Sequence, residues 1–384
     1  MRYYAIDLFY DNVPRTLDVL PKTGHTFSSH NGSTLLPGAL NVEFDIPSAQ
    51  YATTGQGTRF RIWGLPKQYL AVDYTGWTFK IYGGMAKGLP LATQQNSRIN
   101  PTANPLAQGT IQTSFGNWTG TNMSLDFIGA AIGGFPQSQF NVQFIWPKGT
   151  KLSNAIQSAL KPLGSTFKYL IKISAQLTSP ADNFGATRLT SITELANHIK
   201  DLSMSPPFPQ KITSTTGTGY TGITTVPQAD GSVLFYDNSV DATTLGNVTT
   251  PSSPQTAGSF ANPIQIDFTD LIGQPTLLNT NLVSVTTILR SDLQVGNWFR
   301  LPVTNPLFTN TIAPSSGTPN IQSYTTILSG KFSVSRIHHF ANFRQGDGSS
   351  WITSIQGSAE ANTSGQNPST NSTGPTVSNV MPSS

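Results

Sequence analysis

The sequence predicts a mainly β protein with a small α/β section. Apolar and polar residues alternate with period two in many short segments, which is typical of half-buried strands. Clusters of Gly, Pro, Asn and Thr separate these segments, as turns between strands require. Only two segments, both in the middle of the chain, have the periodicity of amphipathic helices.

The clearest strand pattern lies near the N-terminus. In ALNVEFDIPS, the apolar residues Leu40, Val42, Phe44 and Ile46 alternate with polar ones. TRFRIWGLP repeats the pattern, and the alternation continues in WTFKIYGG, SLDFIG, FNVQFIWP and YLIKIS. It returns in the C-terminal third, in IQIDFTDLIG, LVSVTTILRSDL, NWFRLP, KFSVSRIHHF and WITSIQG. We therefore expect strands in both the first and the last third of the chain.

The two helical segments carry signals for their ends. In TKLSNAIQSALKPLG, Thr150 is the expected N-cap and Gly164 stands where a helix C-terminus favours glycine. In SITELANHIKDL, Ser191 and Glu194 have the spacing of a capping box. Each segment presents one apolar face, so we expect two short helices packed on strands.

Two further segments differ in composition from the rest. Residues 205–262 are rich in Pro, Thr, Ser and Gly, and only SVLFYDN reads as a strand there, so we expect long loops with one or two hairpins. Residues 358–384 contain no aromatic residue and one charge, Glu360. Such a composition cannot bury a core, so we expect a tail that only a partner could order and that folding does not need.

Composition narrows the function classes. Charged residues make up 10% of the 384 residues, against about 25% in ordinary globular domains, and the net charge of +4 includes no basic run that would bind nucleic acid. The absence of cysteine excludes disulfides, thiolate metal sites and a cysteine nucleophile. We find no apolar stretch that predicts a membrane span, and the N-terminus lacks the apolar core of a signal peptide. We therefore expect the protein to stay where it is made or to leave within a particle.

Residues 333–357, SVSRIHHFANFRQGDGSSWITSIQG, hold the residue types of a hydrolase or metal site. Asp347 next to Gly348 is a hairpin signal, and WITSIQG reads as the returning strand. Alternation places His338 on the side of Phe332 and Val334, facing a packed layer, and His339 on the opposite side. We predict a structural hairpin in which neither histidine is catalytic, because the chain has no G-x-S-x-G nucleophile motif.

No other motif predicts a catalytic, cofactor or metal residue. GTGYTG at residues 217–222 matches a phosphate-binding pattern but lacks the strand before it and the helix after it. None of the five histidines has zinc-helix spacing, and no carboxylate pair predicts glycoside hydrolysis. We assign a structural role to His198, which lies on the second expected helix next to the apolar Ile199.

The C-terminal third resembles the baseplate hub family of contractile phage tails. The resemblance lies in DLIGQP, then ILRSDLQVGNWFRL, then GKFSVSRIHHFANFRQGDGSSW, in that order. LNVEFDI with TRFRIWGLP, WPKGTKLSNAIQSAL, SITELANHI and ADGSVLFYDN are similar to earlier parts of the family, so the order extends over residues 35–357. The chain departs from the family at Ala341 and Asn342, in the length of the 205–262 region and in its polar tail.

The resemblance implies a non-enzymatic structural protein without a cofactor. It implies two tube-like β-barrel or sandwich domains per chain, in a homotrimer that forms a pseudo-sixfold ring. Its partners would be the tail tube protein or tube initiator, the central spike and baseplate wedge proteins. The residues expected to carry the structural motif are Gly273, Pro275, Gly296, Trp298, Gly330, His338, His339 and Trp351.

The resulting domain division is 1–140 for a first β domain, 141–262 for an α/β section, 263–357 for a second β domain and 358–384 for the tail. Two other functions stay open. A carbohydrate-binding or adhesion protein would need exposed aromatic platforms, which some of Trp63, Trp77, Trp118, Trp146, Trp298 and Trp351 could supply. A cell-wall hydrolase carried by the tail would need lytic activity of the purified chain.

Overall fold

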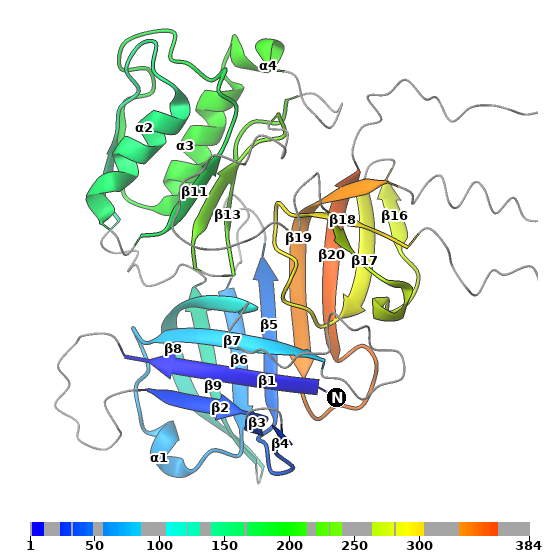
Figure 1. Ribbon diagram of the computed structural model, residues 1–384. Helices are drawn as coiled ribbons and strands as arrows, with labels where there is room; N and C mark the ends of the chain where they lie inside the picture. The colour runs from blue at the N-terminus through cyan, green and yellow to red at the C-terminus, as the bar shows by residue number, and fades with distance from the viewer. Residues whose placement is uncertain are drawn as a thin grey trace, which may run out of the picture.

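The computed structural model has a mainly β fold, as the alternation pattern predicts (Figure 1). It contains one large, mostly antiparallel sheet and a separate section in which two helices pack beside short strands. The structure describes residues 2–10, 24–31, 34–48, 57–85, 105–120, 122–130, 140–164, 167–212, 220–229, 231–239, 263–279, 282–302 and 330–359.

The elements follow one another along the chain in three groups. The N-terminal strands are β1 (Arg2–Phe9), β2 (His25–Ser28), β3 (His30–Asn31), β4 (Thr34–Leu35), β5 (Val42–Ser48), β6 (Gly57–Trp63), β7 (Thr78–Met85), β8 (Ala107–Thr119) and β9 (Asn122–Ala130), with helix α1 (Lys67–Leu70). The middle section holds β10 (Val142–Phe144), α2 (Leu152–Leu160), η3 (Lys161–Leu163), β11 (Tyr169–Lys172), β12 (Thr187–Leu189), α3 (Ile192–Met204), α4 (Phe208–Lys211), β13 (Thr224–Pro227) and β14 (Val233–Tyr236). The C-terminal group is β15 (Ile264–Gln265), η5 (Phe268–Asp270), β16 (Thr276–Asn279), β17 (Leu282–Ile288), β18 (Trp298–Arg300), β19 (Lys331–Asn342) and β20 (Trp351–Ala359).

Apart from β3 and β4, which pair with each other, the strands of the N-terminal and C-terminal groups form one 13-stranded sheet. Its strand order is β16-β17-β20-β19-β5-β6-β9-β8-β7-β1-β2, with β18 paired to β19 and β15 paired to β18. The two groups join where β19 pairs antiparallel with β5. The first and last thirds of the chain are therefore continuous through backbone hydrogen bonds, although β5 ends at Ser48 and β19 begins only at Lys331.

The sheet contains the same five-stranded arrangement twice. We call β5-β6-β9-β8-β7 the first β unit and β16-β17-β20-β19-β18 the second β unit, each written in its order in the sheet. Going across the sheet, the strands of each unit are the first, second, fifth, fourth and third of that unit in the chain. The two topologies are therefore identical. The residues alone do not predict this repeated strand order, because few side chains are shared between the units; only the family resemblance implies two tube-like domains.

Backbone details support the equivalence of the two units. In the first unit, the Gly76 N–H donates to the Ile111 carbonyl at 2.8 Å, and in the second the Gly296 N–H donates to the Val334 carbonyl at 2.8 Å. Both glycines have positive φ, 82° and 88°, which side chains disfavour. A β-bulge follows directly after Ile111 in β8 and after Val334 in β19.

Each unit also packs one phenylalanine ring against a glycine of its last strand. A Cβ on Gly129 would lie 2.3 Å from the Phe79 ring, and a Cβ on Gly357 would lie 2.6 Å from the Phe299 ring. Carbon atoms in contact stay about 3.5–4.0 Å apart, so any side chain at these glycines would collide with the ring. The phenylalanine ring and the glycine backbone thus approach closely at equivalent places in the two units.

Three hydrophobic cores stabilise the molecule. One lies in the first unit and includes Phe60, Phe79 and Phe127, and a second lies in the second unit around Phe299 and Phe332. The third belongs to the middle section, where α2 and α3 bury their apolar faces. Each β unit therefore closes over its own apolar interior while sharing one sheet with the other.

The middle section confirms both predicted helices and corrects one cap. Ser191 caps α3, where its hydroxyl accepts the Glu194 N–H at 3.1 Å. Thr150 does not cap α2, because α2 begins at Leu152 and the Thr150 hydroxyl donates to the Pro147 carbonyl instead. Gly164, with a φ of 80°, ends the 3-10 turn that extends α2.

The structure also corrects our interpretation of residues 205–262. The expected strand is present as β14, and it forms the expected hairpin with β13. Sequence reasoning missed β13 itself, because its TTVP sequence sits in a Thr-rich region that reads as loop. Residues 213–219 and 240–262, and the tail from 360 onwards, lie outside the described residues.

Candidate functional site

The hairpin formed by β19 and β20 is the candidate functional site of the sequence analysis, and it joins the two β units. Its open end, with Phe332 and Ile355, belongs to the core of the second unit. Its turn end, with Ala341 and Trp351, belongs to the core of the first unit. The chemistry-bearing residues of segment 333–357 therefore lie on the element that both cores share.

One edge of β19 is divided between two partners. Residues 331–333 pair with β18 of the second unit, and residues 337–342 pair with β5 of the first unit. The bulge after Val334 separates these two stretches. Because a bulge adds a residue and bends the strand, it lets β19 pass from one unit to the next.

The same bulge overturns the predicted orientation of the histidines. Strict alternation would place His338 with Phe332 and Val334 in a packed layer. The extra residue of the bulge turns the side chains that follow it to the opposite faces of the sheet. His339 is therefore buried at 3% exposure, whereas the His338 side chain is 41% exposed. His338 Nε2 lies 2.5 Å from Asp45 Oδ1 on β5, so this contact spans the junction of the units.

His339 lies in a closed polar environment. Its Nδ1 is 2.9 Å from the Thr353 hydroxyl, which also accepts the Arg290 N–H at 3.1 Å. Burial lowers the pKa of His339 to about 3, and the neighbouring His338 contributes in the same direction. The ring is therefore neutral near pH 7. Within the described residues, no serine hydroxyl is hydrogen-bonded to either His338 or His339.

Asp347 organises the turn of the hairpin. Its carboxylate accepts the Ser349 N–H and hydroxyl at 3.0 and 2.9 Å and the Gln345 amide at 2.5 Å. The Ser349 hydroxyl is the main cause of its lowered pKa. The Arg2 guanidinium of β1 donates to the turn carbonyls of Asn342, Gln345 and Asp347. Because the donors to its carboxylate are groups of the turn itself, Asp347 serves the turn geometry.

Trp351 anchors the hairpin in the first core. The residue is 2% exposed, and its indole N–H donates to the Gly84 carbonyl of β7 at 3.0 Å. Its ring packs edge-on against Phe44 and Phe343, with centroids 5.6 and 5.8 Å away. A tryptophan of the second unit thus fills a place in the first unit's core.

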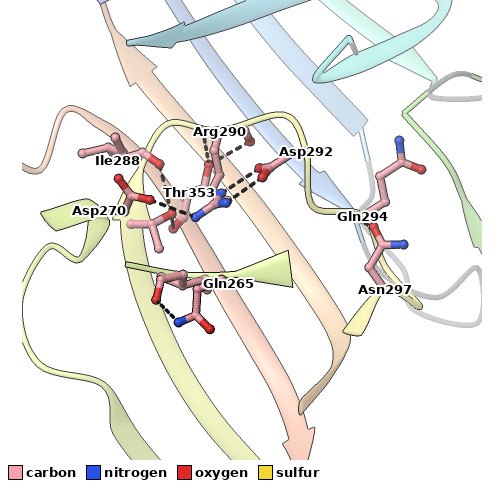
Figure 2. Close-up of polar contacts among 10 residues, drawn as sticks. Gln265, Asp270, Ile288, Arg290, Asp292, Gln294, Asn297 and Thr353 are labelled. Carbon is pink, nitrogen blue, oxygen red and sulfur yellow. Dashed lines mark hydrogen bonds and ion pairs between the residues drawn. The ribbon is translucent and has the colours of Figure 1, made fainter. Parts of the chain in front are cut away.

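A buried charge cluster lies beside the hairpin, and sequence reasoning missed it (Figure 2). The Arg290 side chain is fully buried and donates two hydrogen bonds to the Asp292 carboxylate, at 2.7 and 2.6 Å. Asp270, itself 1% exposed, lies 3.5 Å from the Arg290 guanidinium. Burial alone would lower the pKa of Arg290, but Asp292 and Asp270 together raise it. The only sequence signal was the pair of opposite charges in LRSD at the end of a strand.

The remaining residues of the predicted structural motif lie in turns and strand ends of the second unit. Gly273, Gly296 and Gly330 have positive φ values of 80°, 88° and 136°. Pro275 directly precedes β16, and Trp298 is the half-buried first residue of β18. The structure thus brings His338, His339 and Trp351 together on one hairpin, whereas the glycines mark the corners around it.

The other candidate motifs form no common site. Of the GTGYTG segment only Tyr220, Thr221 and Gly222 are described, and a strand follows them instead of a helix. Within the described ranges, no group of three metal-binding side chains comes together, and no helix could span a membrane. Trp77, Trp146 and Trp351 are buried, whereas Trp118 is 74% exposed.

No family model and no curated protein matches the sequence. Among solved structures, the chain is similar to a tail protein from Neisseria meningitidis, with 10% identity, 93% of this chain and 97% of that chain covered, and a TM-score of 0.42. It is similar to a 43 kDa prophage tail protein from Shewanella oneidensis, with 8% identity, coverage of 92% and 97%, and a TM-score of 0.42. It is also similar to an E. coli component of the type VI secretion system, with 7% identity, coverage of 85% and 76%, and a TM-score of 0.42.

Two of these solved structures are tail proteins, and the third is a secretion-system component described as structurally similar to T4 bacteriophage tail proteins.

Proposed function

We propose that this chain is a structural virion protein, the baseplate hub of a contractile tail. As a homotrimer it would join a hexameric tail tube to a trimeric central spike. The observation that carries this proposal is the duplicated β unit, present twice in one chain and joined head to tail by β19 and β5. A chain with two equivalent units suits a position where six-fold and three-fold symmetry meet.

The number of β units per chain suits a junction between six-fold and three-fold symmetry. Three chains with two units each would supply six similar β units around one axis, which matches six tube subunits. The middle section, with α2 and α3, occurs once per chain and would therefore be present three times, as a trimeric spike requires. One protein would thus offer a six-fold surface on one side and a three-fold surface on the other.

Composition agrees with an assembly protein. Only 10% of the residues are charged, and the cores of protein interfaces are depleted of charged side chains. The buried ionic cluster and the hairpin histidines serve packing, because their partners are other side chains of this chain. On this proposal, the protein is assembled in the bacterial cytoplasm and resides in the virion, where it contacts tube, spike and baseplate wedge proteins.

The mass of the assembled protein tests the proposal. Native mass spectrometry of the purified chain should give a species of about 124 kDa, three times the 41.2 kDa of one chain. With the spike protein added, we expect a heavier complex that contains three copies of this chain. An interface of this permanent kind should bury more than about 2,000 Å² in total. A monomer at micromolar concentration with the spike present would refute the hub.

A further inference from the structure

The two β units differ in what covers the equivalent edge of their fourth strand. In the second unit, residues 337–342 of β19 pair with β5, and every second residue of this stretch is buried. The bulges align Ile111 with Val334, and cross-strand pairing then aligns Ser114 with Ile337 and Gly116 with His339. Residues 114–119 of β8 are thus the counterpart of the part of β19 that β5 covers.

This counterpart on β8 has one ladder partner. Residues 113–119 pair with β9, and β7 pairs only with residues 107–110. Leu70 of α1 lies 3.2 Å from the place of a Cβ on Gly116, so α1 covers the core side of this half-strand. Among the described residues, none forms a ladder along its other edge, and Phe115 and Trp118 are 49% and 74% exposed.

The opposite end of the sheet presents the complementary edge. β16 is the first strand of the second unit, as β5 is of the first, and in the described part of the chain it pairs only with β17. Leu277 and Leu278 on β16 are 39% and 51% exposed. The strand carries no charge and no proline, the usual protections of an open edge.

From this pattern, which rests on the proposed trimer, we infer that β8 residues 114–119 of one chain pair with β16 of the next chain. The contact repeats between chains the junction that β19 and β5 make within one chain. Asp45 of β5 pairs with Arg59 of β6, and Thr276 of β16 pairs with Ser284 of β17. Arg59 and Ser284 hold equivalent positions in the two units, so Thr276 is the counterpart of Asp45. The internal pair Phe340 with Asp45 therefore becomes Asn117 with Thr276 of the second copy.

The occupant is a second copy for geometric reasons. β16 and β8 are separated by β17, β20, β19, β5, β6 and β9, which at about 4.8 Å per strand places them roughly 34 Å apart along the sheet. One chain cannot bring these edges together, whereas two neighbouring chains can. Pairing would also cover Phe115, Trp118, Leu277 and Leu278, the large exposed apolar residues of these two strands.

The absence of cysteine allows a direct cross-linking test. The double variant Asn117→Cys with Thr276→Cys is oxidised and analysed by non-reducing electrophoresis and native mass spectrometry. A second pair, Phe115→Cys with Leu278→Cys, tests another position of the same register, equivalent to the internal pair His338 with Pro47. A disulfide requires Cα atoms within about 7 Å, so it can form only between copies. We expect a reducible, covalently closed trimer from at least one pair.

The matched control combines Thr276→Cys with Thr26→Cys on β2, the other end of the sheet, and should give no cross-link. A trimer in native mass spectra without a covalent species from either pair would overturn this contact and leave the hub proposal standing. An open ladder of covalent oligomers would support the contact and refute the trimer. A monomer without cross-links would overturn both.

Discussion

The two β units have the same backbone plan but different interiors. Both hold a phenylalanine ring over a glycine, and both carry a bulge after the residue that bonds to a turn glycine. In the first unit, the buried Leu125 pairs with Gly116, which has no side chain and is exposed. At the equivalent places the second unit has Thr353 and His339, which are hydrogen-bonded to each other.

This difference shows that the shared plan lies in backbone requirements. A positive φ, a bulge and a close ring contact fix the path of the strands in both units, whereas the side chains between them are free to be apolar or polar. The second unit has used that freedom for a connected network of His339, Thr353, Arg290 and two aspartates. The two units should therefore respond alike to backbone changes and differently to loss of charge.

Removing Arg290 should have the largest effect. The Arg290→Leu variant leaves Asp270 buried without its cation, and breaking a buried pair in this way costs about 3–5 kcal/mol. Chemical denaturation of the purified chain measures the loss of unfolding free energy. Adding Asp270→Asn and Asp292→Asn should recover much of it, because the buried negative charge is then gone. A single variant as stable as the wild type would show that the cluster contributes nothing.

Acid should destabilise the second unit through His339. Burial lowers its folded pKa to about 3, whereas in the unfolded chain the pKa is near 6.5. The unfolded state thus binds more protons between these values, so stability is full above pH 6.5 and falls as the pH drops toward 3. From pH 6.5 to 4.5 we expect a loss of about 2–3 kcal/mol from this group.

The His339→Gln variant isolates that contribution. Gln keeps a polar group near Thr353 but does not titrate, so its free energy of unfolding should fall less steeply below pH 6.5 than that of the wild type. At pH 7 we expect a modest loss of about 1–3 kcal/mol from the altered hydrogen bond. Parallel slopes for the two proteins between pH 6.5 and 4.5 would contradict a neutral, buried His339.

Equivalent glycines should show equivalent sensitivity. Gly129→Ala and Gly357→Ala each force a Cβ into a phenylalanine ring, and overpacking of this kind costs about 1–3 kcal/mol. Gly346→Ala is the control, because a Cβ there has no atom within 4 Å. Thermal unfolding of the three variants measures the shifts. A large loss at only one of the two packed glycines would argue against a shared plan for the units.

The sequence predicted this fold where local pattern decides the outcome. Alternation in VEFDIPS and the capping-box spacing at Ser191 predicted a buried strand face and a helix start, and both are present. The predicted hairpin around Asp347 is also present. These features depend on neighbours in sequence, which a single chain displays directly.

The errors have non-local causes. The bulge after Val334 is a backbone feature that no residue type announces, and it moved His339 instead of His338 into the interior. The Arg290 cluster needs Asp270 from a different element, so its burial could not be read from LRSD alone. The repeated unit follows from the family resemblance and not from residue patterns, because it lies in strand order and turn geometry, which different side chains can satisfy.

The smallest effect should come from the first unit's own ionic cluster. Arg61 contacts Glu43 and Asp126, as Arg290 contacts two aspartates, but the Arg61 side chain is 36% exposed and that of Arg290 is fully buried. Water reaches the Arg61 guanidinium and screens its pairs, and the buried Asp126 keeps the hydrogen bond from the Ser124 hydroxyl, so Arg61→Leu should cost about 1 kcal/mol in chemical denaturation. Added salt should narrow the gap between Arg61→Leu and the wild type, but should leave the gap for Arg290→Leu unchanged. Equal losses of unfolding free energy in the two variants would contradict this expectation. They would mean that the burial of the arginine does not affect how much its ion pairs stabilise the fold.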